Sequence, residues 1–197
     1  RKVGQQVASE LVTVVDDPTL AGKYGSYAYD DEGTPAQKTV LIHNGVLETY
    51  MYDLEWARRR GSSSTGNGRR QSFQFRPIPR MSNTYLAAGE TVPEEIIAQT
   101  NSGLLVKRMG GGQVNPTTGD FVFDIAEGYL IEQGQVTDPV RGATLSGNGP
   151  KVLLSVDLVG TDLGFGIGTC GKDGQGVPVS DAQPTIRIPE LVVGGLL

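Results

Sequence analysis

Residues 38–52, KTVLIHNGVLETYMY, decide the fold class of this chain, because they place Asn44-Gly45 between two β-rich runs. Asn-Gly in that setting is the strongest short signal for a β-hairpin, since both turn positions need positive φ. His43 then lies at the end of the hairpin, where an ordinary turn-flanking residue is expected. The stretch predicts antiparallel β-structure.

Similar signals recur along the chain. Phe121, Phe123 and Ile125 alternate within a run over 120–131, and Gln133-Gly134 marks a further hairpin into a run over 135–140. Other expected strands cover 7–15, 104–109, 141–145 and 185–193. Short helices are expected over 53–60, 91–99 and 150–154. We therefore predict a mainly β (α+β) fold with antiparallel, hairpin-rich sheets and two or three short helices, in a single domain over residues 1–197.

Composition supports this class. The chain has 197 residues, 38% hydrophobic residues, 28 glycines and 11 prolines, which favours short strands and many turns over long helices. No stretch approaches the roughly 18 apolar residues needed to cross a bilayer, and no leader is recognised, so we expect a cytoplasmic protein without a membrane partner. The single histidine excludes a multi-histidine metal site built by this chain alone.

Charge is distributed unevenly, because residues 58–80 hold seven arginines and no acid while the whole chain has a net charge of −5. Arg69 and Arg70 follow the glycine-rich stretch 65–68 and are expected in a polar loop over 61–72. The segment indicates a site for carboxylates or an acidic partner. The alternatives are a solvated loop and internal pairing with acids. Direct nucleic-acid binding is disfavoured by the acidic total and the few interleaved aromatic residues.

Two glycine-rich stretches are further candidates. Cys170 lies in 164–178, expected to be glycine-punctuated loop, and Lys172 nearby favours the thiolate that binds metal. A lone cysteine is otherwise a small buried hydrophobe. The loop of Gly110, Gly111, Gly112 and Gln113 allows close backbone approach, either to a bound peptide or within a sharp turn.

Phrases in order along the whole chain resemble the C-terminal region of the TldD/PmbA family, and GGGQVNPTTG and CGKDGQ place it nearer the TldD branch. The phrases are ASELVTVVDD (8–17), GSYAYDDEGTP (25–35), TGNGRRQS (65–72), PRMSNTYLAAGE (79–90), VKRMGGGQVNPTTGDFVFDIAEGYLIEQG (106–134), PVRGATLSGNGP (139–150) and GTCGKDGQGVPV (168–179). Members were first described as modulators of DNA gyrase. The resemblance implies a cytoplasmic zinc metallopeptidase that works as a TldD–TldE pair, or as a homodimer, on unfolded or small peptides.

In that family a His-Glu-x-x-x-His motif supplies two zinc ligands and the general base, and a C-terminal cysteine completes the site. Cys170 matches that cysteine, so the resemblance implies that Cys170 is a metal ligand. The motif is absent from this chain, and His43 matches neither histidine. We therefore expect the motif just upstream of Arg1 in a longer parent. With no catalytic residue of its own, this chain as a C-terminal fragment is expected to be inactive and to bind zinc weakly or not at all.

Two functions remain open. The first is the C-terminal domain of a zinc-dependent peptidase, which supplies Cys170 and part of a peptide-binding cleft formed by Gly110–Gln113, Arg69 and Arg70. The alternative is a non-catalytic binding or regulatory subunit, similar to TldE or to a DNA gyrase modulator. A parent that carries the His-Glu-x-x-x-His motif would favour the first.

Overall fold

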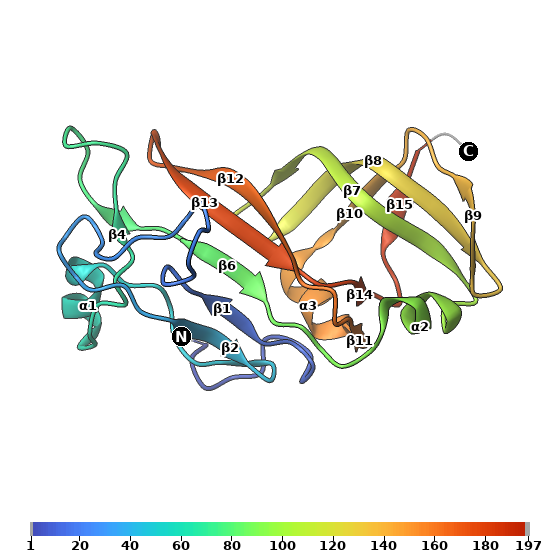
Figure 1. The fold of residues 1–197 in the computed structure, drawn as a ribbon, viewed down its shortest axis with the longest axis horizontal. Coiled ribbons are helices and arrows are strands. Elements are labelled where there is room, and N and C mark those ends of the chain that lie inside the picture. Colours follow the sequence, from blue (N-terminus) through green and yellow to red (C-terminus); the bar gives the residue numbers. More distant parts are fainter. Residues whose placement is uncertain (1, 196–197) are drawn as a thin grey trace.

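The computed structural model describes residues 2–195, which form two main β-sheets with short helices at their margins (Figure 1). The larger sheet has the strand order β12-β13-β6-β1-β2-β3, and the second sheet has the order β15-β10-β8-β7 with β9 also paired to β8. The larger sheet consists of β1 (Val14–Asp16), β2 (Thr39–His43), β3 (Val46–Leu47), β6 (Asn83–Leu86), β12 (Gly164–Lys172) and β13 (Gln175–Gln183). The mainly β, α+β prediction is confirmed.

The larger sheet joins distant parts of the chain. β1 pairs antiparallel with both β2 and β6, and β13 pairs parallel with β6, with Ser180 opposite Asn83. The β13–β6 pair is an exception to the expected antiparallel pattern. It brings the β12–β13 hairpin beside strands formed about 100 residues earlier.

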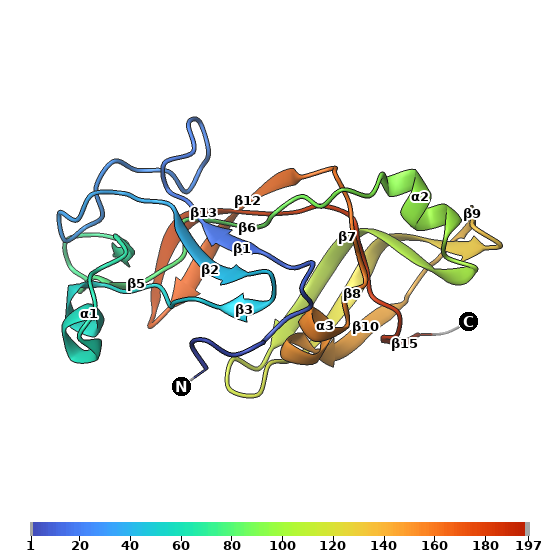
Figure 2. The same cartoon turned by 90° about the horizontal axis from the view of Figure 1, so that it is seen from below.

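The second sheet is built mostly from sequential hairpins. Its strands are β7 (Ser102–Val114), β8 (Asp120–Glu132), β9 (Gln135–Pro139), β10 (Thr144–Asn148) and β15 (Val192–Gly194). β7 forms one edge, and its pairing with β8 shifts register around Met109 and Gly112. Figures 1 and 2 show the two sheets in opposite halves of an elongated molecule.

Short elements complete the fold. Two-stranded pairs join β4 (Gly68–Arg69) to β5 (Ile78–Pro79) and β11 (Leu158–Val159) to β14 (Ile186–Arg187). The helices are α1 (Leu54–Arg60), α2 (Pro93–Ala98) and α3 (Gly149–Ser155). No helix within residues 2–195 is long and apolar enough to span a bilayer.

Local signals account for the elements that were predicted well. Asn44 and Gly45 have φ values of 46° and 82°, and Gln133 and Gly134 have 51° and 76°, so both hairpins turn where expected. Asp53 caps α1 by accepting from the Trp56 amide at 2.6 Å. Gly61, in the left-handed conformation, ends that helix.

Several expectations were wrong. The strand over 7–15 is reduced to β1 at its end. The helix expected over 91–99 is the shorter α2, whose N-cap is Val92 without a side-chain hydrogen bond. The expected loop over 164–178 is occupied by β12 and the first part of β13. The expected final strand over 185–193 is divided between β14 and β15.

Two apolar clusters form the core, one for each main sheet. The first lies among the larger sheet, the β11 region and the N-terminal turns, and the second lies on β8 and β10. Their buried members are Ala8, Val12, Leu86, Val156 and Val159 in the first cluster and Ile125, Ala143 and Leu145 in the second. Burial of these side chains fixes the sheets that carry the candidate site.

Candidate functional site

Cys170 lies on β12, at the edge of the larger sheet, and is half-buried. It stands opposite Val177 of β13, which is buried, so the two side chains share one face of the hairpin. Asp173 and Gly174 turn the hairpin with φ values of 51° and 72°. An ordered strand therefore carries the thiol three residues before a tight turn, where the sequence suggested a loop.

The outer edge of β12 is open within the described part of the chain, because the strand pairs with β13 alone. Glycines flank Cys170 along this strand. A Cβ on Gly171 would meet nothing within 4 Å, and one on Gly168 would meet only the Val179 side chain at 3.8 Å. The unpaired edge of β12 can thus accept main-chain hydrogen bonds from another extended chain, and the neighbouring glycines add no side chains beside Cys170.

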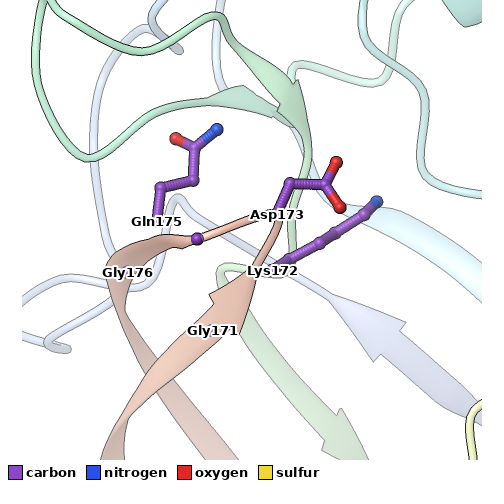
Figure 3. Close-up of a pocket in the computed structure, with 6 residues that line it drawn as sticks. Gly171, Lys172, Asp173, Gln175 and Gly176 are labelled. Carbon is purple, nitrogen blue, oxygen red and sulfur yellow. The ribbon is translucent and has the colours of Figure 1, made fainter.

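The tip of the hairpin bounds a shallow, open pocket (Figure 3), lined by residues 171–176. Lys172 and Asp173 extend to one side of the tip, and the Lys172 ammonium donates to the Pro79 carbonyl at 3.0 Å. Gln175 is buried and donates to the Arg76 carbonyl at 3.0 Å. The tip is therefore fastened to the arginine-rich segment.

Metal-ligating groups are sparse around Cys170. Within residues 2–195 no group of three His, Cys, Asp or Glu side chains is placed to hold a metal ion. His43 is exposed at the end of β2, four strands from β12 in the sheet order, or about 19 Å at 4.8 Å per strand. His43 and Cys170 cannot therefore share one ion. A half-exposed thiol on a fixed strand fits one position of a zinc site, and the other ligands must come from other residues.

The arginine-rich segment differs from the exposed loop that was expected, since residues 65–69 are buried. Arg69 is only 7% exposed; it donates to the Met81 carbonyl and to the Pro178 carbonyl at 2.9 Å, and stacks on the Tyr27 ring. Burial lowers the pKa of the Arg69 guanidinium, opposed by nearby Tyr27 and Asp16. The prediction of an exposed Arg69 was wrong, because its partners are distant carbonyls that local sequence does not reveal.

Arg70 is placed differently. It is half-buried, its amide donates to Asp31 Oδ2 at 2.8 Å, and its Nε lies 3.9 Å from Asp31 Oδ1. Arg59 and Arg76 both pair with Glu55. Internal pairing with acids, one of the alternatives considered above, therefore accounts for part of this segment.

The residues Gly110, Gly111, Gly112 and Gln113 lie within β7 and are exposed. The expected loop is thus a bulged part of an edge strand. A Cβ on Gly112 would fall 2.2 Å from the Phe123 ring, so the packing of Phe123 requires glycine there. These residues and Cys170 belong to different sheets.

Sequence reasoning missed a buried polar network that supports the site. Asp16 is fully buried and accepts from Asn67 Nδ2 at 2.7 Å and from the Ser82 amide at 2.7 Å. Arg80 is 1% exposed and donates to the carbonyls of Cys170 and Gln175. The sequence signal for this network was a cluster of polar residues around a short apolar strand. That signal could not identify the network, because polar residues in an exposed turn give the same pattern.

Comparison with known proteins identifies the family. Residues 1–195 match the family model described as "PmbA/TldA metallopeptidase C-terminal domain". The chain is 49% identical over 196 residues to a "Metalloprotease TldD homolog" of Haemophilus influenzae, covering 98% of this chain and 41% of that protein. It is 32% identical over 192 residues to a "Zinc metalloprotease TldD homolog" of Saccharolobus solfataricus, covering 97% of this chain and 43% of that protein.

The fold agrees with solved relatives. The crystal structure of TldE from Thermococcus kodakarensis superposes with a TM-score of 0.80 at 28% identity, covering 98% of this chain and 42% of that one. The chain thus spans about two fifths of the length of these proteins. Sequence and fold together assign this chain to the PmbA/TldD metallopeptidase family, of which it corresponds to the C-terminal domain.

Proposed function

We propose that this chain acts as the C-terminal domain of a zinc-dependent peptidase for unfolded or small peptides, and that it supplies Cys170 as a zinc ligand. The observation that carries the proposal is the placement of a half-exposed thiol on an open edge strand. A relative is named a zinc metalloprotease, which supports the choice of metal. Two further ligands and a general base would come from a His-Glu-x-x-x-His motif elsewhere in the parent protein.

Zinc, when bound, would polarise the scissile carbonyl and lower the pKa of a bound water. The residues of this chain would orient the peptide. A peptide in extended conformation can pair by main-chain hydrogen bonds with the open edge of β12 beside Cys170, which would make binding independent of side-chain sequence. The edge of β7 at Gly110–Gln113 offers a second strand of this kind.

Of the two arginines suggested for peptide binding, the structure favours Arg70. Arg69 donates its hydrogen bonds to carbonyls inside the domain. Arg70 is half-buried beside Asp31, and part of its side chain remains in contact with solvent. We propose that Arg70 contributes to binding carboxylates of a peptide or of a partner subunit. That partner would be a TldE/PmbA-type subunit or a second copy of the chain.

The alternative function, a non-catalytic subunit, is equally consistent with the fold. The fold matches TldE with a TM-score of 0.80, so the domain architecture alone does not separate a peptidase subunit from its TldE-type partner. A full-length sequence that lacks the His-Glu-x-x-x-His motif would favour this alternative.

The test of the proposal is the metal content of the full-length protein with Cys170→Ser. A hydroxyl is a far poorer zinc ligand than a thiolate and is nearly isosteric, so zinc occupancy and peptidase activity should fall while the fold remains. His43→Ala serves as the control and should leave both unchanged. Undiminished zinc and turnover in Cys170→Ser would refute the role of Cys170. Residues 1–197 alone should show no peptidase activity and weak zinc binding.

A further inference from the structure

We propose that Arg80 is a positioning residue for Cys170, because its buried guanidinium holds the two strands of the β12–β13 hairpin through their main-chain carbonyls. The inference rests on the proposed function, since it assigns Arg80 a role at a metal ligand. It concerns a residue within the arginine-rich segment that the sequence suggested for anion binding.

The contacts of Arg80 link both strands of the hairpin. Its Nη2 donates to the carbonyl of Cys170 on β12 and to the carbonyl of Gln175 on β13, the latter at 3.1 Å. In the hairpin register Cys170 is opposite Val177 and Lys172 is opposite Gln175. One nitrogen therefore fixes the strand that carries the thiol to the strand that returns from the turn.

The charge of Arg80 is costly where it lies. The residue is 1% exposed, and no described side chain or carbonyl accepts from its Nε or Nη1. None of the ion pairs within residues 2–195 includes Arg80. A buried cation without a carboxylate lowers stability relative to an apolar side chain of similar size. Its presence is therefore better explained by what it holds than by a contribution to folding.

Arg80 is itself anchored to the centre of the larger sheet. Its amide donates to the Asn67 carbonyl at 2.9 Å, and Asn67 Nδ2 donates to the Arg80 carbonyl at 3.0 Å. The same Nδ2 lies 2.7 Å from Asp16 Oδ2 on β1. A chain of buried polar contacts thus runs from Asp16 through Asn67 and Arg80 to the main chain of Cys170.

This arrangement matters for a metal ligand, because ligand distances tolerate errors of only about 0.2 Å. The Cys170 side chain has one rotatable bond before its sulfur, so the position of its main chain largely determines where the thiol can lie. Replacing a residue that holds a metal ligand in place by hydrogen bonds, without touching the metal itself, typically weakens metal affinity by about 10–100-fold. We expect an effect of that size from loss of Arg80.

Arg69 provides a matched control within the same segment. It is also buried and also donates to main-chain carbonyls, those of Met81 and of Pro178 on β13, but within residues 2–195 it donates no hydrogen bond to β12. Arg69→Met and Arg80→Met each remove a buried guanidinium and leave an apolar side chain of similar length. Only Arg80→Met removes a hydrogen bond to Cys170.

The experiment uses the full-length protein loaded with cobalt(II), whose thiolate charge-transfer absorption reports a Cys–metal bond independently of activity. Arg80→Met should weaken metal affinity about 10–100-fold and diminish this absorption, and hydrogen exchange of amides 168–177 should accelerate. Arg69→Met should leave the absorption intact. Equal effects of both variants, or wild-type affinity and exchange in Arg80→Met, would overturn the inference.

The Cys170→Ser and Arg80→Met variants distinguish loss of the ligand from loss of its positioning. If Cys170→Ser abolishes the cobalt absorption and Arg80→Met does not alter it, Cys170 is a ligand and Arg80 does not position it. If Cys170→Ser retains the absorption, the proposed ligand itself is wrong, and the positioning role fails with it. Should Arg80→Met not fold, Arg80→Lys keeps the charge but lacks the fork geometry, and a several-fold loss of affinity is expected.

Discussion

Replacement of Asp16 by asparagine should lower the free energy of unfolding by about 3–5 kcal/mol, although the two side chains have the same shape. The Asp16 side chain has no solvent-exposed surface, and hydrogen-bond donors surround both of its carboxylate oxygens. Its Oδ1 accepts from the Ser82 amide at 2.7 Å and from Thr84 Oγ1 at 2.6 Å. Its Oδ2 accepts from Ser82 Oγ at 2.8 Å and from Asn67 Nδ2 at 2.7 Å.

The magnitude follows from what an amide can replace. The NH₂ group of asparagine has to take the Oδ2 position, because the Ser82 amide opposite Oδ1 cannot act as an acceptor. Ser82 Oγ can rotate to accept, but Asn67 Nδ2 then faces another donor. One orphaned buried donor costs about 1–3 kcal/mol, and the two bonds that Oδ1 still accepts lose charge assistance worth about 1 kcal/mol each. Asn67 cannot reverse its amide freely, since its Oδ1 accepts from Thr65 Oγ1 at 2.6 Å.

The assay is urea denaturation of residues 1–197, followed by the fluorescence of Trp56, the single tryptophan. Asp173→Asn is the matched control, because Asp173 is exposed at a hairpin turn with φ of 51°, a conformation that asparagine adopts readily. The control should change the free energy of unfolding by less than about 0.5 kcal/mol. A loss below about 1 kcal/mol for Asp16→Asn would refute the reasoning from unsatisfied donors.

Two further predictions use the same measurement. Arg69→Ala should lower the free energy of unfolding by about 2–4 kcal/mol, because two carbonyls and the Tyr27 ring lose their partner. Arg70→Ala should lower it by less than about 1 kcal/mol, since the pair with Asp31 is partly solvated, and equal losses would contradict the burial of Arg69. Burial raises the pKa of Tyr27, so its contribution is complete below the unfolded pKa of about 10 and is lost as pH rises toward the folded value. Tyr27→Phe should therefore flatten the fall in unfolding free energy above pH about 10, and an unchanged slope would exclude Tyr27 as its source.

The sequence revealed those parts of the fold whose causes are local. Asn44-Gly45 and Gln133-Gly134 turn their hairpins by their own φ preferences, and Asp53 caps α1 three residues from its donor. Glycines at alternate positions of β12 led to the prediction of a loop, because glycine has a low intrinsic preference for strands. The segment is nevertheless a strand, because it pairs with β13.

The same distinction applies to the candidate site. Cys170 was identified through a resemblance between sequences, and its position on an edge strand came only from the structure. Arg69 and Arg80 belong to the basic segment that the sequence suggested for carboxylates or an acidic partner, yet their partners are carbonyls 12–109 residues away along the chain. Contacts of that kind depend on tertiary structure, which no local pattern of charge encodes.

The parallel pairing of β13 with β6 has a consequence for the order in which the chain can fold. During synthesis, β6 emerges about 100 residues before the strand that covers its open side, so it remains an unprotected edge until residue 182 is available. The hairpins of β7 to β10 lie between these partners and can form first from nearby contacts. The β12–β13 hairpin is therefore among the last elements to join the molecule. A chain truncated before residue 175 would leave the edge of β6 unpaired and prone to aggregation.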